Sequence, residues 1–205
     1  MRGQAVAWAA HLGRARDVTR IRAYAVWSLV DVIRMKFGAQ GLHAIRMKLT
    51  SERREQFRTL PGQSAWSDYG LYVDVLRSAV DALYGCDPIG AFDLSRAARQ
   101  LDAKRMFAEL GIFETPRTFL SQLRSMRSHY FDGGSADGVL VSERLLHFKL
   151  SGLVSPCEVA ANDVAGGVAG MFEMSGAREV RLFEMERTAT SCTAWIAFES
   201  DHGVM

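Results

Sequence analysis

The chain has 205 residues, 48% of them apolar, which is enough for one domain with a sizeable core or for one domain with an extension. Its formal net charge of +2 is near neutral and excludes the strongly acidic and strongly basic classes. No apolar stretch approaches the ~20 residues that a membrane-spanning helix needs, so we expect no membrane span.

The near-neutral total hides an uneven distribution of charge. Residues 1–60 carry twelve Lys and Arg against four Asp and Glu, whereas the remainder carries thirteen against nineteen. A basic half of this kind can mark a nucleic-acid or membrane face, or it can be the solvated side of ordinary helices. The basic residues alternate with apolar ones, and no nucleic-acid-reading helix stands out. Nucleic-acid binding is therefore the least favoured function.

The three cysteines are Cys86, Cys157 and Cys192. They are too few and too scattered for a disulfide framework, and no two have the spacing of a zinc knuckle. The N-terminus is a poor signal peptide, because His11 interrupts its short apolar patch and Arg14 follows. A reducing cytoplasm is the simplest location for such a chain.

The first predicted helix lies near the N-terminus. Val26, Val30, Ile33 and Phe37 are spaced by four, three and four residues, which places them on one helix face, and Gly38 is a suitable stop. A short helix follows over residues 42–49.

Cap signals place the next helices. Thr50 or Ser51 opens one helix, and Ser67 or Asp68 caps the clearest helix of the chain, over residues 69–83.

Two X-Pro pairs mark the last helices of this half. Asp87-Pro88 opens a helix that we expect to close at Gly111, and Thr115-Pro116 opens another that runs through Tyr130.

In the last third of the chain the hydrophobic period changes from helical to two. Strand-like runs occupy residues 138–141 and 145–150, a helix lies within residues 156–175, and two more strand-like runs occupy residues 179–185 and 192–198.

This order predicts an α+β fold, with an N-terminal helical layer packed on a C-terminal four-stranded antiparallel sheet built as β-hairpin–α–β-β. We expect residues 1–20 to form an N-terminal arm, disordered or helical, and residues 21–200 to form a single ligand-binding-like domain.

The helix of the last third is unusually rich in small residues, including Gly166, Gly167 and Gly170. A glycine inside a helix costs roughly 1 kcal/mol relative to alanine, so close packing on a sheet, a helix or a ligand must offset the cost. We therefore take Gly166 and Gly170 as interface candidates.

Five segments carry a resemblance to a known family: Ala25 to Leu49, Trp66-Ser67-Asp68-Tyr69, Gly85-Cys86-Asp87-Pro88, Arg124 to Gly133, and Met174 to Val180. They resemble a paralogous family of unknown function described from myxobacteria. That family is similar to the four-vinyl-reductase-type domain and to haem-nitric-oxide-binding domains, which share the fold group named for nitric-oxide signalling and Golgi transport. The resemblance implies a cytoplasmic ligand-binding or scaffolding domain of bacterial regulation, often dimeric.

The chain departs from these relatives at their metal and haem motifs. Related reductase-type domains carry several cysteines near the C-terminus, where this chain has only Cys192. The Tyr-x-Ser-x-Arg motif that anchors haem propionates is absent, and no two histidines have the i, i+4 spacing of a helical metal site. We therefore expect no metal and no cofactor.

Aromatic and polar side chains on the predicted helices are candidates for a ligand pocket. The aromatic ones are also typical of a core, and Arg127 and His129 could instead act as favourable charges at a helix C-terminus. If these residues form a pocket, Arg127 and His129 provide polar contacts at the mouth of an apolar site. The candidates are Trp27, Trp66, Tyr69, Tyr72, Arg127, His129 and Tyr130.

Trp195 belongs to the polar-facing set of its strand, so it is an interface candidate, with ordinary sheet packing as the alternative. Nucleophile, phosphate-loop and dinucleotide motifs are absent. We expect a non-enzymatic regulatory sensor or adaptor domain that binds a small, largely apolar ligand or a protein partner. The alternative is a homodimeric scaffold module of a signalling complex, without a ligand.

Overall fold

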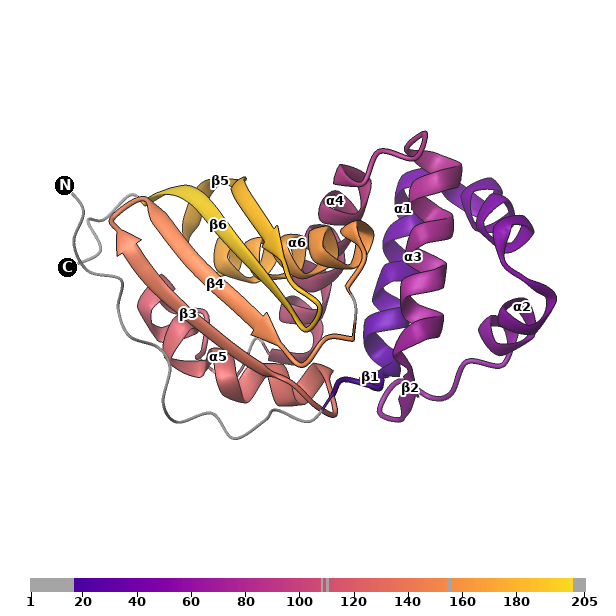
Figure 1. Cartoon of the computed structure of the whole chain (residues 1–205), viewed down its shortest axis with the longest axis horizontal. Coiled ribbons are helices and arrows are strands. Elements are labelled where there is room, and N and C mark those ends of the chain that lie inside the picture. The colour runs from indigo at the N-terminus through magenta and orange to yellow at the C-terminus, as the bar shows by residue number, and fades with distance from the viewer. Residues whose placement is uncertain (1–16, 108, 110, 155, 201–205) are drawn as a thin grey trace.

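The computed structural model describes residues 17–200 except residues 108, 110 and 155, so most of the expected N-terminal arm lies outside the described residues. Figure 1 shows the arrangement: long helices of the N-terminal half stand at one end, and the sheet with its helices forms the other. The helices are α1 (Ala23–Lys48), α2 (Ser51–Arg58), α3 (Tyr69–Leu83), α4 (Ile89–Asp102), α5 (Pro116–Tyr130) and α6 (Glu158–Met174).

Local signals explain where the helices begin and end. Gly38 breaks α1 with a φ of 66°, a left-handed conformation that suits glycine. The side chains of Thr50, Asp68 and Thr115 accept hydrogen bonds from backbone N–H groups in the first turns of α2, α3 and α5. These caps confirm the predicted starts.

The helix that was predicted to reach Gly111 is shorter than expected. α4 ends at Asp102, and a turn of π-helix covers Ala103–Phe107. Its start also differs by one residue from the expected one, which had Asp87 as the N-cap. The N-cap is Pro88, and Asp87 accepts a hydrogen bond from the N–H of Ile89.

A short two-stranded ribbon was missed by the sequence prediction. β1 (Arg20–Arg22) pairs antiparallel with β2 (Trp66–Asp68). Three-residue strands carry too little periodicity to be recognised. Asp132, which follows α5, accepts hydrogen bonds from Thr19 and Arg20 and so holds the start of β1 against the end of α5.

The predicted four-stranded antiparallel sheet is confirmed. Its strands are β3 (Ser135–Ser142), β4 (Leu145–Ser151), β5 (Ala177–Arg187) and β6 (Ser191–Ser200), in the order β3-β4-β6-β5. Because α6 connects the β3–β4 hairpin to β5, the observed unit is β-hairpin–α–β-β, and the fold class is α+β as expected.

Alternation along the strands gives the sheet an inner and an outer face. The inner face carries fully buried side chains such as Leu146, Phe148, Cys192 and Ile196, and it packs on α6. The outer face carries His147 and Trp195, which are paired across β4 and β6.

The small residues of α6 bring it very close to α4. A Cβ atom on Gly166 would lie 2.2 Å from the carbonyl oxygen of Phe92, and one on Gly170 would lie 2.3 Å from that of Arg96. Only glycine permits this approach of two backbones. The cost of glycine in the helix is offset by helix–helix packing, with the sheet on the other side of α6.

Candidate functional site

A small cavity lies where α3, α4, α5, α6 and the inner face of the sheet meet. Its volume is about 70 Å³. Most of its wall is apolar, with Leu123 and Met126 from α5, Phe148 and Leu150 from β4, and Val164, Val168 and Met171 from α6. These residues are all buried, whereas Arg127 and Phe131, which also line the cavity, are partly exposed, so the cavity approaches the surface at these two residues.

One end of the cavity is polar. Asp163 of α6 lines it, together with Tyr72 of α3 and with Ser95 and Arg99 of α4. The Oδ1 atom of Asp163 accepts hydrogen bonds from the hydroxyls of Tyr72 at 2.5 Å and Ser95 at 2.6 Å. No described residue donates a hydrogen bond to the second oxygen of Asp163, Oδ2.

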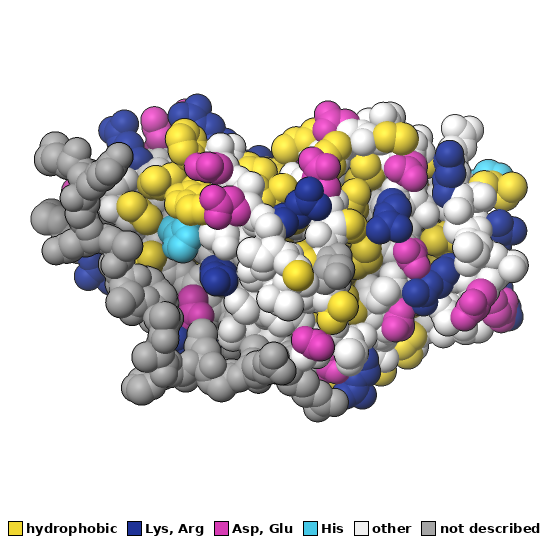
Figure 2. Space-filling model, in the orientation of Figure 1, with side chains coloured by type: hydrophobic (Ala, Val, Ile, Leu, Met, Phe, Trp, Pro, Cys, Tyr) yellow, Lys and Arg dark blue, Asp and Glu magenta, His cyan; other side chains and the backbone are white. Residues whose placement is uncertain are grey.

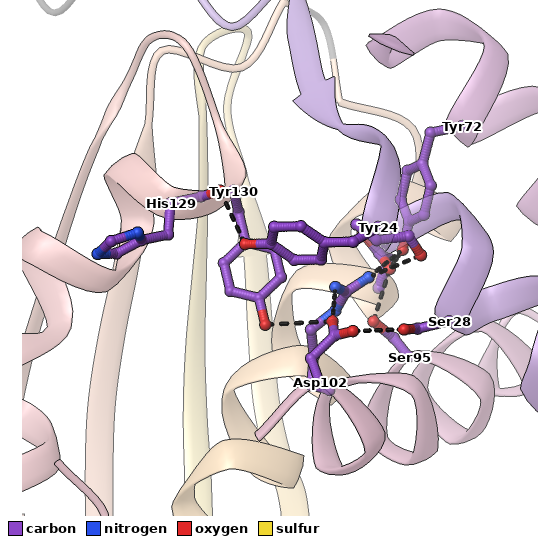
Figure 3. A network of polar contacts seen from close by, with 10 residues as sticks. Tyr24, Ser28, Tyr72, Ser95, Asp102, His129 and Tyr130 are labelled. Atoms are coloured by element: carbon purple, nitrogen blue, oxygen red, sulfur yellow. Dashed lines mark hydrogen bonds and ion pairs between the residues drawn. The ribbon is translucent and has the colours of Figure 1, made fainter. Parts of the chain in front are cut away.

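Behind this end, Arg99 forms a buried ion pair with Asp102. Asp102 also accepts hydrogen bonds from the hydroxyls of Ser28 on α1 and Tyr130 on α5. Arg99 donates to the hydroxyl oxygen of Tyr72 at 3.2 Å, so the two carboxylates belong to one network (Figure 3). The network links four helices besides α6.

The charges of this network do not balance. Arg99 supplies one positive charge, whereas Asp102 and Asp163 can supply two negative ones. Burial raises the pKa of both carboxyls, and the Arg99 guanidinium partly counteracts the rise. Burial alone lowers the pKa of Arg99, but Asp102 and its other neighbours hold that pKa well above its usual value, so Arg99 stays charged. Asp102 touches Arg99 directly, so Asp163 is the less compensated carboxyl.

Four of the predicted pocket residues lie at or beside this cavity. Tyr72, Arg127 and Tyr130 line it. Tyr69 stacks on Tyr72 with ring centroids 6.2 Å apart, and its hydroxyl is buried without a hydrogen-bond partner among the described residues.

The other three predicted pocket residues lie elsewhere. Trp27 donates its indole N–H to the carbonyl of Pro61, and Trp66 lies in β2 under the guanidinium of Arg22. His129 is exposed, and its imidazole points away from the network, which it meets only through its backbone carbonyl, the acceptor for Tyr24 (Figure 3).

The residues that define the polar end were missed by sequence reasoning. Asp163 lies among alanine, glycine and valine on its helix, and a charged residue in such a setting is the one available signal, whereas Arg99 has polar neighbours and gives none. The signal does not reveal the partner, because Tyr72 is 91 positions from Asp163 in the sequence.

The predicted interface residues fall in two different environments. Gly166 and Gly170 are buried and covered by the backbone of α4. Trp195 lies on the outer face of the sheet, where its ring centroid is 4.9 Å from that of His147. Exposed Val139, Val141 and Phe183 belong to the neighbouring strands, and Figure 2 shows apolar side chains among charged ones on this side of the molecule.

Comparison with known proteins identifies the fold. No family model matches the chain, and no curated protein matches it. Solved structures do match, and those compared are H-NOX domains, that is, haem-nitric-oxide-binding domains. The chain therefore has the H-NOX fold, as the resemblance in its sequence implied.

Three of these structures give the extent of the likeness. An H-NOX protein from S. oneidensis in the Fe(II)NO state has a TM-score of 0.64 at 9% identity, over 87% of this chain and 99% of that one. An oxygen-binding H-NOX domain related to soluble guanylate cyclases has a TM-score of 0.62 at 8% identity, over 90% and 97%. Unliganded Fe(II) H-NOX from K. algicida has a TM-score of 0.60 at 12% identity, over 88% and 97%.

The residues around the cavity do not fit a haem group. A cavity of ~150 Å³ admits one benzene molecule, and a porphyrin is several times larger, whereas the cavity here measures about 70 Å³. Of the described histidines, His43 and His129 are exposed and His147 lies on the outer face of the sheet, so none lines the cavity. A buried ion pair and its hydroxyl partners occupy the polar end instead.

The described residues contain no cluster of three or more His, Cys, Asp or Glu that could hold a metal ion. In the same part of the chain, no helix has the length and apolar character needed to cross a membrane.

Proposed function

We propose that the chain is a non-enzymatic sensor domain that binds a small, largely apolar molecule in the cavity between the helical half and the sheet. The observation that carries this proposal is a cavity with apolar walls and one polar end. In such a site the apolar wall holds the apolar part of a ligand, and a few polar contacts orient the ligand.

The position of the cavity supports a sensing role. Its wall includes residues of α3, α4, α5, α6, β3 and β4. The polar network at one end continues to Ser28 of α1. A molecule that changes the packing at the cavity therefore acts on both halves of the protein, and a partner that contacts either half can respond to it.

The proposal can be tested by native mass spectrometry of protein purified from its own cells. We expect a bound mass that is lost on denaturation. The matched variant Ala136→Val places a larger side chain at the cavity wall, on a strand where β-branched residues are favoured, and it should remove the bound mass while the protein stays folded. Protein with no bound mass, and with no small molecule that raises its melting temperature, would contradict the proposal.

A second candidate function rests on the outer face of the sheet. Trp195 and the exposed Val139, Val141 and Phe183 give this face an apolar surface suited to a protein partner or a second copy of the chain. Trp195→Ala should then shift the elution volume in size-exclusion chromatography or remove a partner from a pull-down. An unchanged elution volume and partner list would count against the scaffold role.

A further inference from the structure

The polar end of the cavity indicates which kind of ligand the site accepts, and this inference rests on the proposed function. We infer that the ligand is a small protonated amine with a short apolar body, held by Asp163. The argument has three parts: an acceptor that is free to bind, a charge that is not balanced, and a wall that limits size.

The first part is the free acceptor. The side chain of Asp163 is buried, and the residue is 5% exposed. Its hydrogen bonds from Tyr72 and Ser95 both end on Oδ1, which leaves Oδ2 without a donor among the described residues. Asp163 lines the cavity, and no described residue donates to Oδ2, so a molecule in the cavity can supply the donor that water would otherwise supply.

The second part is charge. The polar groups that face Asp163 are Tyr72 from α3 and Ser95 and Arg99 from α4. The single guanidinium is already in direct contact with Asp102. When Asp163 is ionised, its carboxylate has no cation in direct contact, and an ammonium group in the cavity would supply one. A carboxylate ligand would add to the imbalance and should be rejected.

The third part is size. The cavity of about 70 Å³ is roughly half of the ~150 Å³ that admits benzene, so the body of the ligand is limited to a few carbon atoms. Leu123, Met126, Val168 and Met171 form the wall around that body. Met126 and Met171 have flexible side chains that can adjust to its shape.

The experiment compares ethylamine, ethanol and acetate, which have two carbon atoms each and differ in the polar group. Dissociation constants are measured by isothermal titration calorimetry at pH 8 on the full chain. We expect ethylamine to bind about tenfold or more tightly than ethanol, since a charge-assisted hydrogen bond is roughly twice as strong as a neutral one. Acetate should not bind.

Two variants connect this ranking to the site. Asp163→Asn keeps the shape but removes the charge, and it should weaken the binding of ethylamine about tenfold or more while changing that of ethanol little. Asp31→Asn, at a surface ion pair with Arg105, is the matched control and should leave all three affinities unchanged. If Asp163→Asn does not fold, two other results test the ligand class. These are the order of the three affinities on the unmodified chain and the loss of binding in Ala136→Val.

The outcomes separate the two levels of the proposal. Equal binding of amine and alcohol, tighter binding of the carboxylate, or an Asp163→Asn variant with unchanged amine affinity would overturn the ligand class and leave the cavity as a ligand site. A protein that binds none of the three probes, and that also carries no bound mass from cells, would overturn both.

Discussion

Tyr72 donates its hydroxyl hydrogen to Asp163 across 2.5 Å, and this contact joins α3 to α6 over a sequence separation of 91 residues. The same hydroxyl oxygen accepts a hydrogen bond from Arg99, so Tyr72 connects the two carboxylates of the network through one side chain. The contact closes the polar end of the cavity and at the same time fastens the N-terminal helices to the sheet-bearing half.

Removing this hydroxyl should destabilise the protein. In Tyr72→Phe, Asp163 loses one of its two donors and Arg99 loses an acceptor, and all three side chains are buried. We expect a loss of about 1–3 kcal/mol in the free energy of unfolding, measured by urea denaturation. The control is Tyr84→Phe, because the Tyr84 hydroxyl makes no hydrogen bond to another described residue and its loss should cost little. Equal effects of the two substitutions would show that the network contributes no stability.

The close contact of α4 and α6 should not tolerate a methyl group at Gly166. Its Cβ would lie 2.7 Å from the Cα of Phe92 and closer still to the carbonyl oxygen. We expect Gly166→Ala to lower the free energy of unfolding by about 1–3 kcal/mol, because backbone atoms cannot move aside locally.

The adjacent glycine offers a matched control. A Cβ on Gly167 would meet the Cγ atom of Arg99 at 3.2 Å, a longer contact and one with a side chain instead of backbone. The higher helix propensity of alanine, worth about 1 kcal/mol, should offset this small crowding in Gly167→Ala. Urea denaturation that ranks Gly167→Ala as the more damaging of the two would contradict the observed packing.

Asp132 should stabilise the fold in a pH-dependent way. Although burial by itself raises the pKa of Asp132, the hydrogen bonds from Arg20 and Thr19 outweigh burial and hold that pKa well below its usual value. A carboxyl of this kind stabilises the folded state at pH values above its unfolded pKa of about 3.9, and the contribution fades as the pH falls toward the folded-state pKa.

We therefore expect Asp132→Asn to cost about 1–3 kcal/mol at pH 7, and the gap to the unmodified protein to narrow below about pH 4. Denaturation at both pH values measures the gap. Glu55→Gln, which removes an exposed ion pair with Arg58, serves for comparison and should cost much less stability than Asp132→Asn. A gap for Asp132→Asn that is the same at pH 3 and pH 7 would speak against the assigned role.

The thiol of Cys192 should be protected from alkylation. Burial, followed by the nearby Asp163, raises the pKa of Cys192 to about 12, and the thiol donates to the carbonyl of Ala161 at 3.7 Å. Cys86 is exposed. With iodoacetamide at pH 8, peptide mass spectrometry should find Cys86 modified in the native protein and Cys192 modified only in denaturant. Equal modification of both under native conditions would mean that the sheet and α6 separate readily.

Much of the fold follows from signals that are local in the sequence. The cap residues Thr50, Asp68 and Thr115 and the break at Gly38 were predictable, because each acts on backbone groups within a few residues of itself. The strands were predictable from their period of two, which the inner and outer faces of the sheet require. The ribbon of β1 and β2 was not, since a three-residue strand is defined by its partner.

The sequence by itself thus determined the elements, their order and the α+β class, because propensity, capping and periodicity are properties of short segments. Only the tertiary structure decided that Asp163, Tyr72, Ser95 and Arg99 meet at one end of a cavity, since their contacts join residues 27 to 91 positions apart. It also decided that the glycines of α6 serve a neighbouring helix. The physical reason is the same in both cases: burial and pairing depend on which distant segments pack together, and no local pattern records that choice.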